Sequence, residues 1–134
     1  MIKYLLSTEI CLWLIKEKPE AMREQLNAHQ GQLAISTLTL TELVAEAECS
    51  AEPGRNLAVV EGFVARLIVL DFDRAAAEHS GQMRAEQGYV MCSALLVAGH
   101  ARSRGLILVV MTTGVGENWP GLRTVHWPTV KEDR

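Results

Sequence analysis

The sequence contains few cysteines, and those it has are widely spaced. Cys11, Cys49 and Cys92 are odd in number and include no Cys-x-x-Cys pair. Disulfide-stabilised folds and zinc sites need cysteines that are paired or clustered. We therefore expect buried free thiols in a reducing compartment.

Long apolar runs and an excess of positive charge are also absent. No run of about eighteen apolar residues occurs, and the N-terminal apolar stretch stops at Ser7. We expect no membrane span and no export signal, and hence a cytoplasmic protein. The net charge of −3 provides no general attraction to nucleic acid, so RNA binding would depend on a local patch such as Arg102 and Arg104.

What remains is an ordinary globular composition. Hydrophobic residues make up 49% of the 134 positions and charged residues 22%, whereas disordered chains are poorer in apolar residues. A chain of this length suits one domain, without repeats or a linker. We predict a single domain over residues 1–134, with residues 128–134 as a frayed tail.

Short apolar strands alternate with amphipathic helices along the chain. The pattern predicts strands over 2–6, 33–35, 68–70, 106–110 and, more weakly, 122–125. Between them it predicts helices that begin after Ser7, at Pro19, near Thr39, after Pro53-Gly54, after Asp73 and near Cys92. Such alternation requires parallel strands, so we predict a three-layer α/β/α sandwich with four or five strands. Ligands bind such sheets beyond the carboxyl ends of the strands, where Ser7 lies.

Five segments of the sequence together resemble a known family. This family is the PIN domain, in the form of the VapC toxins, and the likeness runs from Met1 to about Trp127. It rests on Met1-Ile-Lys-Tyr-Leu-Leu-Ser-Thr-Glu-Ile-Cys, Ala34-Ile-Ser-Thr-Leu-Thr-Leu-Thr-Glu-Leu-Val, Arg55-Asn-Leu-Ala-Val-Val-Glu-Gly-Phe, Ala98-Gly-His-Ala-Arg-Ser-Arg-Gly-Leu and Pro120-Gly-Leu-Arg.

The resemblance implies a PIN-like fold and a Mg²⁺- or Mn²⁺-dependent endoribonuclease. Members of the family cut RNA, commonly the anticodon stem-loop of tRNA, and are held inactive by an antitoxin of the VapB kind. Divalent ions of this type take oxygen ligands, so the chemistry requires clustered carboxylates at the strand ends.

The acidic pattern of the family is largely missing from this sequence. Ser7-Thr8-Glu9 stands where the family has Asp-Thr-Asn, and Ser93 stands where an Asp opens a helix. Thr112 and Val115 occupy further positions at which the family carries polar or acidic ligands, and the segment between Glu86 and Ser93 is shorter than in relatives. Only Glu42 remains as the family has it.

Each candidate site residue also has a purely structural interpretation. Glu42 is either a metal ligand or the third helical residue of a capping box with Thr39. Glu9 is either a substitute ligand or a first-turn carboxylate that the helix dipole favours, and Ser7 and Ser93 are most simply helix caps.

The remaining candidates concern partners. His100, Arg102 and Arg104 lie at a helix end and could contact RNA phosphates, although a solvated helix end explains them as well. Family members use their early helices for a toxin dimer and an antitoxin groove, so we predict a homodimer. The apolar residues that suggest these surfaces are Trp13, Leu14, Val60, Phe63 and Val64.

Two functions follow from this sequence. The favoured one is a PIN-domain variant that keeps its fold and partner binding but is catalytically inactive or strongly impaired. The alternative is an active metal-dependent endoribonuclease in which Glu9 and Glu42 hold one ion, because Mg²⁺ often binds only one or two protein carboxylates.

Overall fold

The protein forms a five-stranded, fully parallel sheet between two layers of helices. The computed structural model describes residues 1–16, 19–88, 90–111 and 119–127. Its strands follow the order β3-β2-β1-β4-β5. They are β1 (Tyr4–Leu6), β2 (Leu33–Ser36), β3 (Ile68–Leu70), β4 (Ile107–Met111) and β5 (Thr124–Trp127). The predicted α/β/α sandwich is confirmed.

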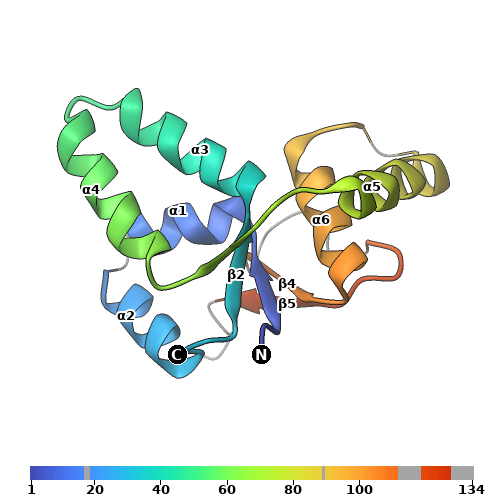
Figure 1. The fold of residues 1–134 in the computed structure, drawn as a ribbon, viewed down its shortest axis with the longest axis horizontal. Helices are drawn as coiled ribbons and strands as arrows, with labels where there is room; N and C mark the ends of the chain where they lie inside the picture. Colours follow the sequence, from blue (N-terminus) through green and yellow to red (C-terminus); the bar gives the residue numbers. More distant parts are fainter. Residues whose placement is uncertain (17–18, 89, 112–118, 128–134) are drawn as a thin grey trace.

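Four helices cover one face of the sheet and two cover the other (Figure 1). The first layer comprises α1 (Thr8–Lys16), α2 (Pro19–Ala28), α3 (Thr37–Glu48) and α4 (Pro53–Val64). The second layer comprises α5 (Arg74–Gln87) and α6 (Ser93–Arg104). We call these the α1–α4 layer and the α5–α6 layer.

Successive residues of a strand point to opposite faces of the sheet, so their side chains belong to two separate hydrophobic cores. In β1, Leu6 joins the core under the α1–α4 layer, whereas Leu5 joins the core under the α5–α6 layer. Val109 and Leu108 divide in the same way in β4. The central strands are therefore apolar on both sides, as expected for a covered parallel sheet.

Several predicted helix ends are confirmed by their hydrogen bonds. The Ser7 hydroxyl accepts a bond of 3.3 Å from the amide of Ile10 at the start of α1. Asp73 caps α5 by accepting a bond of 3.0 Å from the amide of Ala76. Gly88 ends α5 in the left-handed conformation, with φ of 70°, which glycine adopts without a steric penalty.

Three predictions about the elements are wrong. Helix α3 begins at Thr37 with Ser36 as its N-cap, so Thr39 and Glu42 lie inside the helix and form no capping box. Strand β3 is an edge strand whose Ile68 is 40% exposed, not a buried strand. The last strand lies two residues later than predicted because its apolar and polar residues alternate without a clear boundary.

Two predictions about burial also need correction. Leu14, Val60 and Phe63 are buried in the core, so they are not surplus surface for a dimer. Among the cysteines, Cys49 and Cys92 are exposed and only Cys11 is buried, where desolvation raises the pKa of its thiol. Among the described residues, no helix is long and apolar enough to cross a membrane.

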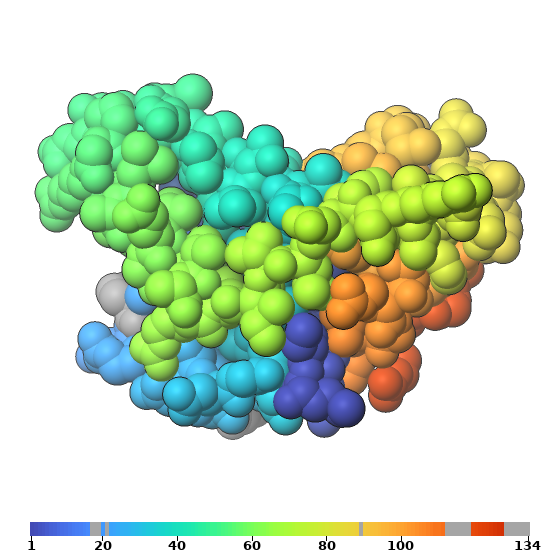
Figure 2. Space-filling view, in the orientation of Figure 1, coloured from blue at the N-terminus to red at the C-terminus, as the bar shows by residue number. Residues whose placement is uncertain are grey.

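The space-filling view shows a notch between two arms of the molecule (Figure 2). Helices α3 and α4 form one arm, and the other contains α5 and the start of α6. Strands β1 and β2 run toward this notch with their carboxyl ends, so the predicted ligand-binding edge of the sheet lies at its base (Figure 1).

Candidate functional site

A cavity of about 230 Å³ lies at this edge of the sheet. Its polar lining comes from three segments that are far apart in the sequence. Ser7, Thr8 and Glu9 follow β1, Glu42 extends from α3, and Ser93 begins α6. The structure thus brings together the described positions at which the family resemblance places its ligands.

Glu42 lies at the centre of this group, with a hydroxyl donor at each carboxylate oxygen. Thr8 donates its hydroxyl to Glu42 Oε1 at 2.6 Å, and Ser93 donates to Glu42 Oε2 at 3.0 Å. Thr8 and Thr39 also share a hydroxyl contact of 3.0 Å. A distance of 2.6 Å is typical of a hydroxyl bound to an ionised carboxylate. The group therefore consists of the Glu42 carboxylate and three hydroxyls, linked to one another by hydrogen bonds.

The rest of the cavity is mainly apolar. Leu12, Val97, Leu108, Val110 and Trp119 line it beside the polar group. Of these, all except Leu12 belong to the core residues of the fold. An apolar wall raises the energy of any charge that it surrounds, so this cavity is poorly suited to concentrated negative charge.

The other predicted ligand positions contribute little. Glu9 lines the cavity but is exposed, and no side-chain hydrogen bond or ion pair to another described residue is found for it. The Ser7 hydroxyl caps α1. Thr112 and Val115 lie outside the described residues.

The oxygen donors that the described residues bring to this cavity do not fit a Mg²⁺ or Mn²⁺ site of the kind the resemblance implies. These ions bind carboxylates strongly, and neutral hydroxyls do not replace the missing charge. Within the described ranges, no three His, Cys, Asp or Glu side chains are grouped so that they could hold a metal ion. Glu42 and the exposed Glu9 are the carboxylates of the cavity.

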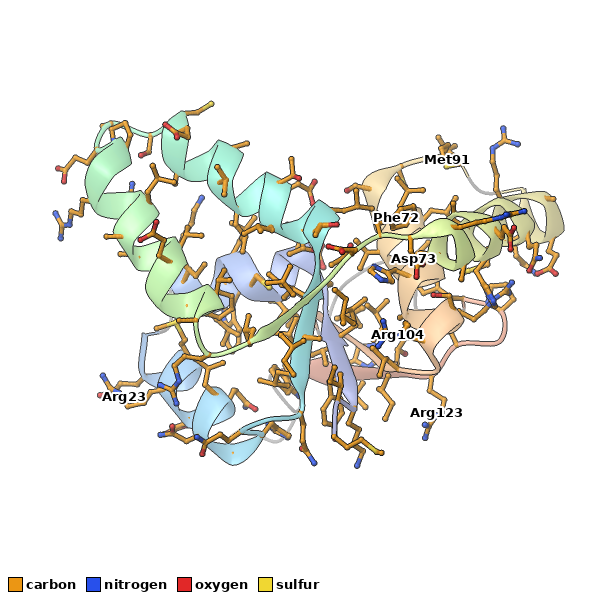
Figure 3. All side chains as sticks on the ribbon, viewed as in Figure 1. Arg23, Phe72, Asp73, Met91, Arg104 and Arg123 are labelled. Atoms are coloured by element: carbon orange, nitrogen blue, oxygen red, sulfur yellow. The ribbon has the colours of Figure 1, made fainter. Side chains whose placement is uncertain are left out.

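The three candidate RNA contacts occupy very different environments. His100 is fully buried and its ring packs edge-on with the Phe72 ring, and neither of its ring nitrogens has a hydrogen-bond partner among the described residues. Phe72 and Asp73 lie where the link from β3 to α5 passes α6 (Figure 3). Burial lowers the pKa of His100, while the nearby carboxylate of Asp73 raises it less strongly.

Arg102 binds within the protein, whereas Arg104 is exposed. The Arg102 guanidinium donates to His79 Nδ1 at 2.9 Å and to Gln82 Oε1 at 2.9 Å on α5. It also donates to the Pro120 carbonyl at 3.2 Å. Of the three candidates, only Arg104 presents an exposed side chain to a partner.

Sequence reasoning missed the hydroxyl donors to Glu42. Thr39 and Glu42 are three residues apart, a spacing that places two side chains on the same helical face. The same spacing is typical of a capping box, so it does not by itself indicate that Thr39 points inward. Thr8 carries no separate signal, because its neighbours Ser7 and Glu9 stand at the positions of altered ligands.

A second and larger cavity, of about 620 Å³, lies in the α1–α4 layer. We call it the α1–α4 groove. Leu12, Ile15, Leu43 and Val60 supply apolar lining, and Val59 on α4 is 40% exposed beside them. Ion pairs lie along it, with Lys16 Nζ at 2.6 Å from Glu46 Oε2 and Arg55 Nη1 at 3.2 Å from Glu52 Oε1.

The sequence profile of the PIN domain matches residues 4–113. The chain belongs to the PIN-domain family. A tRNA(fMet)-specific endonuclease VapC from Shigella flexneri is 53% identical over 131 residues, which cover 95% of this chain and 99% of that protein. The Ribonuclease VapC2 of Haemophilus influenzae is 39% identical over the same share of each chain.

Solved PIN-domain structures agree with this assignment. The fold matches a chain of the DNA-bound VapBC of Salmonella typhimurium with a TM-score of 0.89 and 46% identity, covering 95% of this chain and 99% of that one. A chain of VapBC2 from Rickettsia felis, bound to a DNA fragment from its promoter, matches with a TM-score of 0.83 and 29% identity over 95% and 99% of the two chains. The resemblance to VapC-type PIN domains is confirmed.

Proposed function

We propose that this chain is a VapC-type partner protein that binds an antitoxin of the VapB kind and cleaves RNA weakly or not at all. The observation that carries this proposal is the contrast between its two cavities. The α1–α4 groove combines an apolar lining with charged edges, whereas the site at the strand ends holds the exposed Glu9 and a Glu42 carboxylate whose two oxygens each accept a hydroxyl.

The α1–α4 groove suits an amphipathic segment of a partner. Apolar side chains of such a segment would pack against Leu12, Ile15 and Val59, because burying apolar area drives association. Lys16, Glu46 and Arg55 would then surround the buried contacts as a polar rim. The similar VapBC of Salmonella typhimurium and VapBC2 of Rickettsia felis support a VapB-type chain as the partner.

The altered site supports impaired cleavage. Metal-assisted hydrolysis of RNA needs a fixed positive charge at the scissile phosphate and an activated water. Glu42 and the exposed Glu9 supply less negative charge than the clustered carboxylates of such a metal site. Among the described residues, neither Thr8 nor Ser93 has a basic group beside it that would make it a nucleophile. Losing one preorganised electrostatic group commonly reduces a rate by about 10² to 10³.

Partner binding can be tested with the VapB chain of the Salmonella typhimurium complex. We expect a stable complex in calorimetric titration, and we expect Val59→Asp to abolish it by placing a charge in the groove. Val90→Asp is the matched control, because Val90 is 77% exposed and does not line the groove. Equal binding by both variants would place the partner elsewhere, and no binding by the unaltered protein would overturn this part of the proposal.

Cleavage can be tested separately with a tRNA(fMet) transcript, the substrate named for the Shigella flexneri relative. We expect the transcript to stay intact with Mg²⁺ or Mn²⁺, and we expect induction in cells without antitoxin to permit growth. Growth arrest that Glu42→Gln abolishes would instead support the alternative, an active endoribonuclease that uses Glu9 and Glu42.

We further propose a cytoplasmic homodimer. Size-exclusion chromatography with light scattering at tens of micromolar would contradict the dimer if it gave a single species near the chain mass of 14.8 kDa.

A further inference from the structure

We propose that Glu42 is a cation-independent latch that joins the two helical layers of this protein. The family resemblance assigns a metal-binding role to this carboxylate. Its surroundings here assign it a structural role, because a hydroxyl group donates to each of its two carboxylate oxygens. The inference rests on the proposed function only in taking the site as unsuited to a divalent ion.

The contacts of Glu42 cross the molecule. Glu42 and Thr39 belong to α3, Thr8 begins α1, and Ser93 begins α6 on the other face of the sheet. The bond from Ser93 therefore joins the α5–α6 layer to the α1–α4 layer at the base of the notch. One side chain holds the first turns of two helices against a third.

The chemistry of the group favours attraction without a metal. In a site built from several carboxylates, the like charges repel each other when the ion is absent. Here the neighbours of Glu42 are hydroxyls, which donate to both of its oxygens. Bonds from a hydroxyl to an ionised carboxylate are stronger than bonds between neutral groups. Both oxygens of Glu42 therefore have hydrogen-bond donors without a metal ion.

The two bonds of the latch differ in exposure, so they should differ in strength. The bond from Thr8 is partly buried and 2.6 Å long, while the bond from Ser93 is exposed and 3.0 Å long. Water competes more effectively for the exposed pair. Removing the Thr8 hydroxyl should therefore destabilise the protein more than removing the Ser93 hydroxyl.

The decisive experiment measures whether Glu42→Gln raises or lowers the melting temperature in the presence of a chelator. Removal of one carboxylate from a metal site relieves repulsion and leaves the melting temperature unchanged or raised. Removal of the latch carboxylate should lower the melting temperature by roughly 4 to 10 °C. Glu48→Gln is the matched control, because Glu48 is exposed on the same helix and should leave the melting temperature unchanged.

Two further measurements keep the proposal testable if Glu42→Gln fails to fold. Thr8→Val and Ser93→Ala should each lower the melting temperature, and Thr41→Val, an exposed position on α3, should not. Unchanged melting temperatures in both hydroxyl variants would overturn the latch even without Glu42→Gln. Where Glu42→Gln does fold, each hydroxyl variant should also lose its effect in that background, as a double-mutant cycle requires of a direct contact. Additive effects in both cycles would overturn the latch.

Amide hydrogen exchange tests the connection between layers directly. We expect Ser93→Ala to speed exchange in the first turn of α6 while leaving the centre of α4 unchanged. Millimolar Mn²⁺ should change neither the melting temperature nor the exchange of the unaltered protein. A rise in melting temperature with Mn²⁺ that Glu42→Gln removes would show a metal site and overturn the proposal. Antitoxin binding is a separate measurement, so failure of the latch leaves that part of the proposed function standing.

Discussion

The two helical layers of this protein are packed by different means. The α1–α4 layer buries large side chains such as Leu14, Leu43 and Phe63, and its outer side carries a groove of about 620 Å³. The α5–α6 layer instead brings two helices into close backbone contact, with Ser80 against Gly99, and it buries the polar side chains of Ser80 and His100. The first layer has room at its surface, whereas the second has none between its helices.

The largest effect is expected at the contact between α5 and α6. A Cβ atom on Gly99 would lie 2.0 Å from Ser80 Oγ and 2.7 Å from the Ser80 backbone, so Gly99→Ala must separate the helices. We expect a loss of about 3 kcal/mol or more in the free energy of unfolding, measured by urea denaturation. Serine at position 80 cannot move aside, because backbone atoms contribute to the clash. A loss below about 1 kcal/mol would show that the two helices pack less closely than described.

The next effect concerns the junction between the layers. Ser7→Asp with Ser93→Asp would place two carboxylates beside Glu42 and remove the hydroxyl that Ser93 donates. In chelator we expect the double variant to lose roughly 2 kcal/mol of stability, because like charges then repel. The melting temperature in chelator and in Mn²⁺ measures this, and the ion should restore part of the loss only in the double variant. An unchanged or raised melting temperature in chelator would refute the expectation.

The sequence predicted the fold more fully than the site. Periodicity located the helices and the central strands because burial on one helical face or on both sheet faces leaves a strong pattern. It placed β5 two residues too early, and it located the edge strand β3 but wrongly predicted that its residues are buried. An edge strand has a neighbour on one side only, so an apolar residue such as Ile68 can remain exposed, and an apolar run alone does not show burial.

The site was predicted in position but not in contacts. The strand-end rule and the family resemblance placed Ser7, Glu42 and Ser93 together, and the structure groups them around one cavity. No sequence signal showed that Thr8 and Thr39 complete the group or that His100 is buried, because these facts depend on how α1, α3 and α6 meet in space. Contacts between distant segments leave no period in a single sequence.

The buried His100 predicts a pH dependence that belongs to the α5–α6 layer. Burial lowers the pKa of its imidazole from the ordinary value of 6.5 and is the largest effect. The carboxylates of Asp73 and Asp71 raise this pKa and Arg104 lowers it, and each of these effects is smaller than that of burial. The unfolded chain therefore binds the proton more readily than the folded one. Stability should be full above about pH 6.5 and should fall as the pH drops through the lowered folded-state pKa.

Chemical denaturation at a series of pH values checks this expectation. One proton can give a slope of at most about 1.4 kcal/mol per pH unit. In His100→Gln this contribution to the slope should vanish, whatever the variant's absolute stability. An identical pH profile in the variant would assign the acid sensitivity to other groups.

The smallest effect is a gain in stability. It tests whether the loss expected at Gly99 comes from replacing a helical glycine or from the contact of that glycine with Ser80. Gly62 lies on the exposed side of α4, and a Cβ atom there would meet nothing within 4 Å. Alanine restricts the unfolded chain and favours the helix, so Gly62→Ala should raise the free energy of unfolding by about 0.5 to 1 kcal/mol. Gly81→Ala is its counterpart on α5, where a Cβ atom also meets nothing, and it should give a similar gain in urea denaturation. Gains at both positions beside a loss at Gly99 would assign that loss to the contact with Ser80. A loss at Gly81 would instead show that the whole α5–α6 layer, and not this one contact, resists added volume.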